Sequence, residues 1–297
     1  MEPFIHFRII THNIRFAIQK PSKGEEHWDL RRQRLINELH FHTRYNPEAL
    51  ICLQEALHRQ LLDVIAGLND AVADEHKWTY IGQGRDDGET AGEYSPILYR
   101  PAIWDMRKFE TIWLSETPEK PSKGWDANLP RILTIGHFCH RTSGRGLVVV
   151  NTHLDDQGVK ARLESARLII SRIKNLSGSP HRDSGSGSDS WPVVLSGDFN
   201  SESSGDAYQL LNGSESPMQD LRDLIAPEKR YGHELTFTGF GHDEEPQKRI
   251  DFLFVGPKSN QSWSAESYAV LENRFEDGVY ISDHRAVVGD IVLASGD

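Results

Sequence analysis

SGDFNSE, residues 196–202, places an acid and an amide two residues apart at the point where an apolar run of the chain ends. The preceding residues 192–195, PVVL, are uncharged and partly β-branched, which is typical of a strand covered on both faces. Side chains two residues apart on an extended segment point the same way. We therefore expect Asp198 and Asn200 to converge on one ligand while Phe199 turns towards the core. The alternative is an Asx-type turn, in which both side chains bond only to their own backbone.

Composition favours one acidic domain. The 297 residues include 44 Asp and Glu against 33 Lys and Arg, a formal net charge of -11, and no break in composition divides them. We therefore expect a single domain over residues 1–297. The acidic balance repels a polyanion unless a basic face or bound cations intervene, which argues against tight non-specific duplex binding. The dense basic cluster Arg31-Arg32-Gln33-Arg34 is predicted to be the solvated face of a helix.

Cysteine spacing, hydropathy and a low-complexity segment bear on location and organisation. The two cysteines, Cys52 and Cys139, lack zinc-type spacing, and a strand-like pattern begins at Phe4 without a preceding signal segment. We therefore expect a reduced, cytoplasmic protein. No apolar run approaches membrane-spanning length, so we expect no membrane contact, and the sequence identifies no protein partner. Residues 177–190 are polar and of low complexity, which predicts a flexible surface insert.

Short apolar runs and helical periodicities are interspersed along the chain. The spacing of apolar residues predicts helices within 28–39, 57–68 and 159–173. Strands are predicted at 4–10, 49–53, 96–99, 132–139, 147–151, 192–195, 250–255 and 286–292. Many strands with a few amphipathic helices predict a layered α/β domain.

In six places a polar group able to bind metal or phosphate adjoins an apolar run. These are IITHNIRF with Asn13, LICLQEAL with Glu55, VVVNTHLDD with His153 and Asp155, VVLSGDFN with Asp198 and Asn200, RIDFLFV with Asp251, and ISDHRAVV with Asp283 and His284. Carboxylate and amide oxygens in this number suit Mg²⁺, with Mn²⁺ as a substitute, better than zinc. The histidines add groups that titrate near neutral pH. The pattern predicts a metal-assisted site at the strand ends.

The strings LQE, NTHLD, GDFN, RIDFLFV and SDH occur in this order, and together they resemble the endonuclease/exonuclease/phosphatase superfamily, which includes pancreatic deoxyribonuclease. The resemblance covers about residues 4–293, and the strings GRDDG, GEYSPILY, WLSETP and GWDANLPR are similar to those of a microbial and fungal subgroup. It implies a four-layered α/β/β/α sandwich with two central, mostly antiparallel sheets and a site at one rim. It also implies divalent-metal-dependent hydrolysis of a phosphoester.

The resemblance further implies a metal site. Glu55 is the principal metal ligand, with Asn13 and Asp283 as its companions. We infer in-line attack of water on phosphorus, with the metal at Glu55 neutralising a non-bridging oxygen. Asn13 and Asn200 orient the phosphate or the water.

Two histidine–carboxylate pairs follow from the same resemblance. His153 matches the histidine that pairs with Glu93, and His284 the one that pairs with Asp251. A carboxylate on the far ring nitrogen fixes the tautomer and raises the basicity of the other nitrogen, as proton transfer at phosphorus requires. The general base stays open between Asp198 and the His284–Asp251 dyad.

The candidates for substrate binding are Arg85, Arg131, Asp155 and Trp125. Arg131, in NLPRIL, matches a family position that reaches the phosphate. Arg85 lies in GQGRDDGETAGE, which is either a charged hairpin tip or a loop that leans over the cleft to hold a terminal phosphate. Trp125 is a candidate wall for a base or a sugar ring, whereas Trp113 is expected to pack in the interior.

We therefore predict a divalent-metal-dependent phosphodiesterase or phosphatase that hydrolyses a nucleotide, an oligonucleotide or another small phosphorylated substrate. A general endo- or exonuclease acting on RNA or DNA is the alternative enzyme, but it requires a basic stripe that the sequence lacks. A non-catalytic phosphate-binding module is disfavoured because every acid and histidine of the constellation is present. Asp156 stands where many members of the subgroup have histidine (THLDH), which bears on substrate choice.

Overall fold

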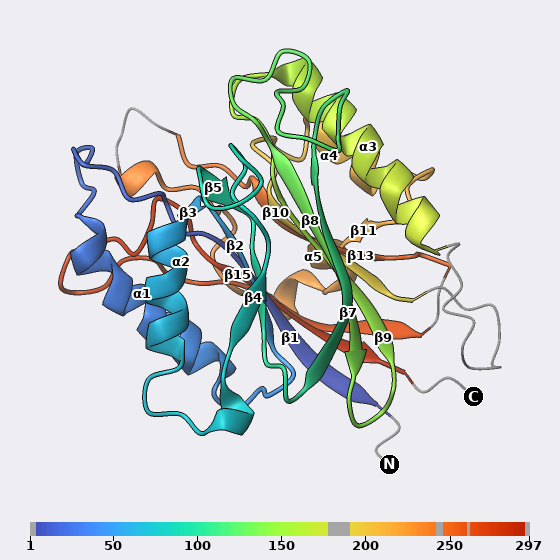
Figure 1. The fold of residues 1–297 in the computed structure, drawn as a ribbon, viewed down its shortest axis with the longest axis horizontal. Helices are drawn as coiled ribbons and strands as arrows, with labels where there is room; N and C mark the ends of the chain where they lie inside the picture. Colours follow the sequence, from blue (N-terminus) through green and yellow to red (C-terminus); the bar gives the residue numbers. More distant parts are fainter. Residues whose placement is uncertain (1–3, 178–190, 242–245, 260–261, 295–297) are drawn as a thin grey trace.

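The computed structural model describes residues 4–177, 191–241, 246–259 and 262–294. Two large sheets pack face to face between two layers of helices (Figure 1). Helices α1 (Trp28–Thr43) and α2 (His58–Leu68) cover one outer face, and α3 (Val159–Ser177) and α4 (Asp206–Asn212) cover the other. This is the four-layered α/β/β/α sandwich that the sequence predicts. Apart from Ser177, which ends α3, the predicted flexible insert lies outside the described residues.

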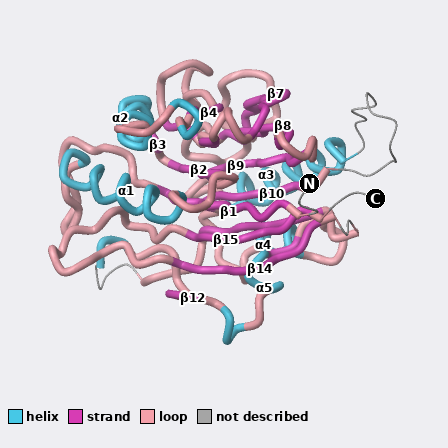
Figure 2. Tube along the Cα trace, turned by 90° about the horizontal axis from the view of Figure 1, so that it is seen from below, coloured by secondary structure: helices cyan, strands magenta, loops and turns pink. Residues whose placement is uncertain are grey.

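The first sheet contains seven strands in the order β12-β14-β15-β1-β2-β6-β4. The strands are β1 (Ile5–Asn13), β2 (Leu50–Gln54), β4 (Thr79–Ile81), β6 (Ile97–Tyr99), β12 (Tyr231–Gly232), β14 (Trp263–Val270) and β15 (Val287–Leu293). Figure 2 shows β2, β1, β15 and β14 following one another across the sheet. Within this sheet β1 is parallel to β2 and β12 to β14, and the other neighbours are antiparallel.

The second sheet contains six strands in the order β11-β13-β10-β9-β8-β7. They are β7 (Trp104–Trp113), β8 (Ile132–His140), β9 (Gly146–His153), β10 (Val193–Asp198), β11 (Gln219–Asp220) and β13 (Asp251–Gly256). Only β9 and β10 are parallel in this sheet as described. The smaller elements are the paired strands β3 (Ala56–Leu57) and β5 (Glu93–Tyr94), the helix α5 (Leu221–Leu224) and the 3₁₀ turns η1 (Asp74–His76), η2 (Pro227–Lys229) and η3 (Gly239–Gly241).

Alternation of side chains along the strands divides the apolar residues among three cores. Between the sheets lie Ile5, Phe7 and Ile9 from β1 with Val194 from β10. On the second sheet's outer face, Val193 and Leu195 pack against α3 and α4, together with Phe199. The third core joins the outer face of the first sheet to α1 and α2. Because successive strand residues face opposite sides, each central strand contributes to two cores, and this accounts for its uninterrupted apolar sequence.

The predicted helices and strands are present, with ends shifted by a few residues. Of the strands that were not predicted, the short ones are β3, β4, β5, β11 and β12, and the long ones are β7 and β14. The sequences of the long ones, WDMRKFETIW and WSAESYAV, contain exposed polar and charged residues that interrupt the apolar pattern. The prediction that Arg31 belongs to a solvated helix face is wrong, because Arg31 is fully buried. Its guanidinium donates hydrogen bonds to the carbonyl oxygens of Ile14, Arg15, Glu26 and Ile281. Arg31 therefore supports the segment that follows β1.

Gly197, in the strand β10, allows two backbones to approach each other closely. Its φ is +148°, and a Cβ atom built on it would lie 2.0 Å from the carbonyl oxygen of Thr152 on the neighbouring strand. Gly197 and Thr152 are paired in the parallel ladder of β10 and β9. This close approach therefore requires glycine directly before Asp198.

Gly197→Ala is expected to lower the free energy of unfolding by about 2–3 kcal/mol, because the backbone of Thr152 cannot yield as a flexible side chain does. Urea unfolding checks this, with Gly144→Ala as the control. Gly144 also has a positive φ, +74°, but nothing lies within 4 Å of the point that a Cβ atom would occupy there. Equal losses in the two variants would contradict the requirement at Gly197.

Candidate active site

Strand register brings three predicted residues of the second sheet side by side. Asp198 ends β10 and is paired with His153 at the end of β9 on one side. On the other side it is paired with Asp251 at the start of the antiparallel strand β13. The backbone ladder thus fixes Asp198 between a histidine and a second acid.

The first sheet brings its polar residues to the same rim. Asn13, the last residue of β1, is paired with Gln54 of β2, and Glu55 follows Gln54 directly. Asp283 and His284 precede β15, whose first residues pair with the end of β1. The six sequence motifs therefore converge where strands of both sheets begin or end.

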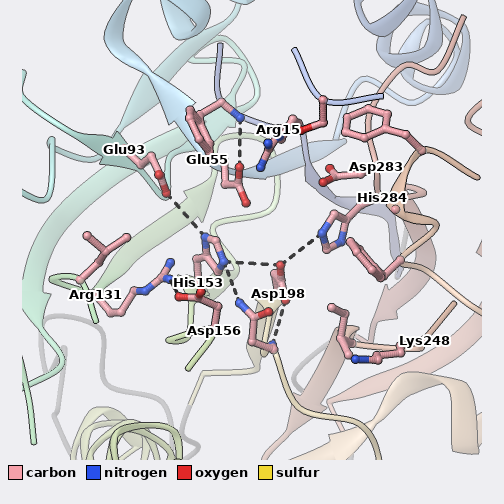
Figure 3. Close-up of a pocket in the computed structure, with 18 residues that line it drawn as sticks. Arg15, Glu55, Glu93, Arg131, His153, Asp156, Asp198, Lys248, Asp283 and His284 are labelled. Atoms are coloured by element: carbon pink, nitrogen blue, oxygen red, sulfur yellow. Dashed lines mark hydrogen bonds and ion pairs between the residues drawn. The ribbon is translucent and has the colours of Figure 1, made fainter. Parts of the chain in front are cut away.

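A cavity of ≈ 380 Å³ opens at this rim (Figure 3). Its deepest lining side chains include Asp198 and His284, which are 1% and 4% exposed. Leu129, which is 38% exposed, and Asp156 lie at its outer part. The cavity thus has a buried acid–histidine floor and an accessible mouth.

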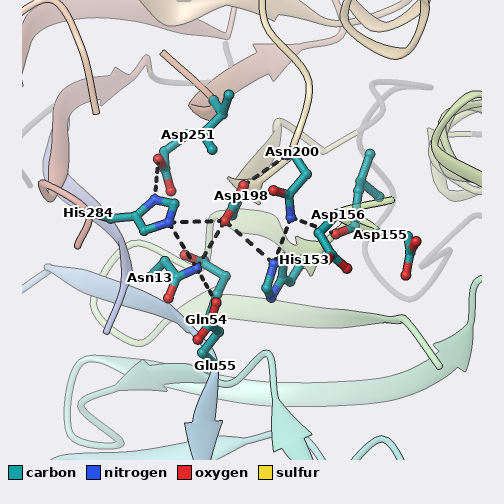
Figure 4. A network of polar contacts seen from close by, with 12 residues as sticks. Asn13, Gln54, Glu55, His153, Asp155, Asp156, Asp198, Asn200, Asp251 and His284 are labelled. Atoms are coloured by element: carbon teal, nitrogen blue, oxygen red, sulfur yellow. Dashed lines mark hydrogen bonds and ion pairs between the residues drawn. The ribbon is translucent and has the colours of Figure 1, made fainter. Parts of the chain in front are cut away.

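Asn13 connects the carboxylates of the two sheets (Figure 4). Its amide nitrogen donates hydrogen bonds of 2.9 Å to both Glu55 Oε1 and Asp198 Oδ2. Its amide oxygen accepts the backbone N–H of Arg15 at 3.0 Å. Both N–H hydrogens and the oxygen of this fully buried amide are therefore engaged, and Asn13 orients Glu55 and Asp198 rather than extending freely into the cavity.

The His284–Asp251 pair predicted from the sequence is formed in the floor of the cavity. His284 Nδ1 lies 2.8 Å from Asp251 Oδ2, and its Nε2 faces Asp198 Oδ2 at 3.6 Å. Burial alone would lower the pKa of His284, but the carboxylates of Asp251 and Asp198 outweigh that effect and raise it well above its usual value. The geometry favours an imidazolium whose Nε2–H is directed into the cavity.

His153 has a different environment. Its Nε2 lies 3.0 Å from Asn200 Nδ2 and 3.5 Å from Asp198 Oδ2, whereas its Nδ1 is 3.8 Å from Glu93, beyond hydrogen-bond distance. Arg85 holds Glu93 instead, through two contacts of 2.7 and 2.9 Å. Burial and the nearby Arg131 and Arg85 cations lower the pKa of His153 well below its usual value. His153 is therefore suited to accept a hydrogen bond from Asn200 as a neutral imidazole.

The pKa values of the Asp198 and Glu93 carboxyl groups are both raised towards neutral pH. Burial, with the repulsion of Asp251, raises the pKa of Asp198 to about 7 despite the opposing His284 charge and Asn13 hydrogen bond. Burial and repulsion from Glu55 raise the pKa of Glu93 to about 7. Carboxyl groups with such pKa values in a cleft are suited to proton transfer.

Arg131 lines the cavity, but Asp155 does not. The Asp155 carboxylate accepts the backbone N–H groups of Asn128, Leu129, Gln157 and Gly158 and the Nε–H of Arg131. Asp126 in turn accepts the N–H groups of Lys160 and Ala161 near the start of α3. The motifs NTHLDD and GWDANLPR are therefore joined, and Asp155 positions the loop that presents Arg131.

Arg85 and Trp125, two more predicted substrate contacts, are not among the cavity-lining residues in the described part of the chain. The Arg85 side chain is buried against Glu93, and its backbone carbonyl accepts the indole N–H of the buried Trp113. The backbone N–H of Trp125 donates to Glu116, and its φ is +50°. Arg85 of the GRDDG segment thus holds the Glu93 carboxylate, and Trp113 packs in the interior as expected.

Sequence reasoning did not single out Arg15, Lys248 and the aromatic pair Phe237 and Phe240, all of which line the cavity. The available signal was closeness in sequence to a motif residue, since Arg15 lies two residues after Asn13 and Lys248 three residues before Asp251. Phe237 contacts the His284 ring edge-on, with centroids 5.1 Å apart. These residues add two cations and two apolar walls to the cavity.

Strained backbone concentrates at the cavity. Among the described residues, the non-glycine residues with positive φ are Arg15, Glu55, Ala71, Trp125, Asn200 and Phe240. Four of these six line the cavity: Arg15 (57°), Glu55 (58°), Asn200 (45°) and Phe240 (57°). Such a conformation costs about 1–3 kcal/mol per residue and persists only where the surroundings enforce it. The surroundings therefore hold these side chains in set directions.

The donor chemistry fits a hard divalent cation near Glu55 and Asp283. Both carboxylates line the cavity, and burial together with the charge of Glu55 raises the pKa of Asp283 even though His284 opposes this. Figure 3 places the Arg15 side chain between them, and the charges of Asp283 and Glu55 raise the pKa of Arg15 against the effect of burial. Crowded carboxylate oxygens that attract a cation are the ligands that Mg²⁺ and Mn²⁺ prefer.

A second group of possible ligands is Asp198, Asp251 and His284, whose nearest donor atoms all lie within 4.8 Å of one another. Asp251 is fully buried and already bonded to His284. This trio is therefore better suited to proton transfer than to holding a cation, and Glu55 and Asp283 are the carboxylates that could hold one.

Residues 10–284 match the model of the Endonuclease/Exonuclease/phosphatase family. A solved endonuclease/exonuclease/phosphatase from Bacteroides vulgatus is 32% identical, with 97% of this chain and 99% of that chain covered and a TM-score of 0.81. A mannosyl-6-phosphatase of Bacteroides thetaiotaomicron is 31% identical, with coverage of 96% and 99% and a TM-score of 0.80. The human Nocturnin catalytic domain, at 15% identity, 97% and 95% coverage and a TM-score of 0.67, shares the fold. No curated protein sequence matches the chain.

No helix in the described residues combines the length and apolar character needed to cross a membrane.

The structure predicts a pH-dependent contribution of Asp155 to stability. Burial alone would raise the pKa of Asp155, but the N–H groups of Gly158 and Asn128, with Arg131, lower it to about 2, below its ordinary 3.8. The ionised form is therefore favoured in the folded protein. Its stabilising effect is complete above the ordinary pKa and is lost as the pH falls towards about 2.

Asp155→Asn is accordingly expected to lower the free energy of unfolding at neutral pH by on the order of 1 kcal/mol. The difference in the free energy of unfolding between this variant and the unsubstituted protein should narrow as the pH falls from about 5 to about 2. Urea unfolding at several pH values measures it. Asp70→Asn, at an exposed position, is the control and should show little loss. A gap that stays constant over this range would contradict the assignment.

Proposed function

The chain belongs to the endonuclease/exonuclease/phosphatase family, and from this premise we propose that it is a divalent-metal-dependent phosphatase of small phosphorylated compounds. The observation that carries the proposal is the placement of Asp198 between two histidines, next to a separate pair of carboxylates, in one cavity. Family members hydrolyse phosphoester bonds, and a relative of 31% identity is a mannosyl-6-phosphatase. A phosphomonoester of a small alcohol is therefore the proposed substrate.

The proposed mechanism assigns separate tasks to the two parts of the floor. A divalent cation at Glu55 and Asp283 would neutralise charge on a phosphoryl oxygen. Asp198 orients the attacking water and accepts its proton as the new phosphorus–oxygen bond forms and the bond to the alcohol breaks. His284, held by Asp251, donates its Nε2–H to another phosphoryl oxygen, and the leaving alcohol takes a proton from solvent.

His153 and Asn200 act beside this centre. The Asn200 amide nitrogen donates to the carbonyl oxygen of Leu154 and faces His153 Nε2, each at 3.0 Å. Its hydrogens are thereby directed away from the substrate, which leaves the amide oxygen as the group that can accept a hydrogen bond from water. The neutral His153 thus fixes the direction of this acceptor.

Glu55→Gln is expected to lower turnover by at least about a hundredfold at saturating Mg²⁺, because the substitution removes the charge that holds the cation. The measurement is phosphate release from a phosphomonoester with chelator, Mg²⁺, Mn²⁺ or Zn²⁺ added in turn. Glu75→Gln, at an exposed position before β4, is the matched control. Near-normal turnover in Glu55→Gln, or restoration by Zn²⁺ alone, would contradict the proposal.

Activity on the preferred substrate is expected to depend weakly on salt. A chain with a net charge of -11 releases few counterions when it binds one phosphate, whereas an enzyme that contacts many phosphates loses affinity steeply as salt rises. The comparison is between a phosphomonoester, a dinucleotide and long single-stranded nucleic acid, from low to physiological salt. Preference for the polymer with a steep salt dependence would favour a nuclease instead.

A further inference from the structure

Asp156 is the acidic residue at the accessible end of the cavity. Its side chain is 44% exposed, in contrast to Asp198, whose side chain is 1% exposed. Figure 3 shows Asp156 and Arg131 together beside His153, with Lys248 on the other side of Asp198. A substrate whose phosphate reaches the floor would therefore extend its alcohol portion past Asp156.

Arg131 and the loop around Asp155 fix the position of the Asp156 carboxylate. Arg131 Nη2 donates to Asp156 Oδ1 at 2.8 Å, and Arg131 Nε faces Asp155 Oδ2 at 3.3 Å. Asp155 is itself held by four backbone N–H groups. Charge-assisted contacts therefore run from the loop backbone through Asp155 and Arg131 to Asp156. These contacts hold the Asp156 carboxylate in place before a ligand binds.

The same contacts change what Arg131 offers to a substrate. Its guanidinium lies against two carboxylates, Asp155 and Asp156, so its charge is largely compensated within the protein. On the side of Arg131 the mouth therefore presents the fixed carboxylate of Asp156, whereas the Lys248 cation lies across the cavity (Figure 3). A second phosphate on the substrate would meet like charge there, whereas hydroxyl groups can donate hydrogen bonds to the outer oxygen of Asp156.

Apolar side chains also line the cavity. Leu129 precedes Arg131 in the same loop and is exposed, and Phe237 and Phe240 line the cavity as well. Apolar walls with one directed carboxylate match a ring that carries both C–H and hydroxyl groups. A nucleic acid backbone, which carries a charge at each step, does not match this arrangement.

We propose that Asp156 is the specificity-determining residue of the site and that it selects the monophosphate of an uncharged polyol, such as a hexose phosphate, by accepting hydrogen bonds from its hydroxyls. This inference rests on the proposed phosphatase function and assigns the class of alcohol that the site accepts. Asp156 touches the alcohol portion and takes no part in the chemical step.

The test compares three substrates with Mg²⁺ present: a hexose 6-phosphate, a hexose 1,6-bisphosphate and phenyl phosphate, which has no hydroxyl groups on its ring. Asp156→Ala should lower kcat/KM for the hexose 6-phosphate about tenfold or more, mainly through KM, and change that for phenyl phosphate by less than about twofold. Asp156→Asn keeps an acceptor oxygen without the charge, so it should retain more hexose 6-phosphate activity than Asp156→Ala and should improve use of the bisphosphate.

Asp70→Ala removes the same charge at an exposed position outside the cavity and should leave all three rates unchanged. Equal losses on the hexose phosphate and phenyl phosphate in Asp156→Ala would overturn the inference, as would unchanged kinetics on both. These outcomes are distinct from failure of the proposed function, in which the unsubstituted protein with Mg²⁺ would release phosphate from none of the three compounds.

Discussion

The site depends on one constraint of the backbone, the pairing of Asp198 with His153 on one side and Asp251 on the other. Gly197 permits this pairing because its missing side chain lets β10 approach Thr152 closely. Asn13 then connects Asp198 to Glu55, which belongs to the first sheet's side of the rim. At the rim, the two sheets are thereby linked through a short polar bridge.

The second determinant is the excess of buried negative charge. Glu55, Glu93, Asp198 and Asp283 line one cavity, and the pKa values of the last three are raised by burial and by neighbouring carboxylates. The two histidines have different neighbours: His284 Nδ1 lies 2.8 Å from Asp251, whereas His153 Nδ1 lies 3.8 Å from Glu93, which Arg85 binds at 2.7 Å. Similar sequence motifs therefore produce two chemically different imidazoles.

The sequence predicts the features that depend on neighbouring residues and misses those that depend on contacts between segments far apart in the chain. Apolar runs predict the central strands, and polar residues at their ends predict the rim, because both are local patterns. The edge strand β7 and the buried Arg31 were not predicted, since the former is interrupted by charges and the latter has partners as distant as Ile281. Arg85 and Asp155 are predicted to bind substrate, but in the structure Arg85 holds Glu93 and Asp155 holds the loop that presents Arg131. Such supporting roles depend on contacts between loops and leave no periodic signal.

The central claim is that the cation belongs to Glu55 and Asp283 while Asp198 performs proton transfer. Calorimetric titration of Mn²⁺ into the unsubstituted protein, Glu55→Gln and Asp198→Asn tests this division without relying on turnover. We predict that Glu55→Gln weakens binding by at least about tenfold and that Asp198→Asn stays within about threefold of the unsubstituted protein. A steep loss in Asp198→Asn with normal affinity in Glu55→Gln would instead place the ion among Asp198, Asp251 and His284 and would contradict this division of roles.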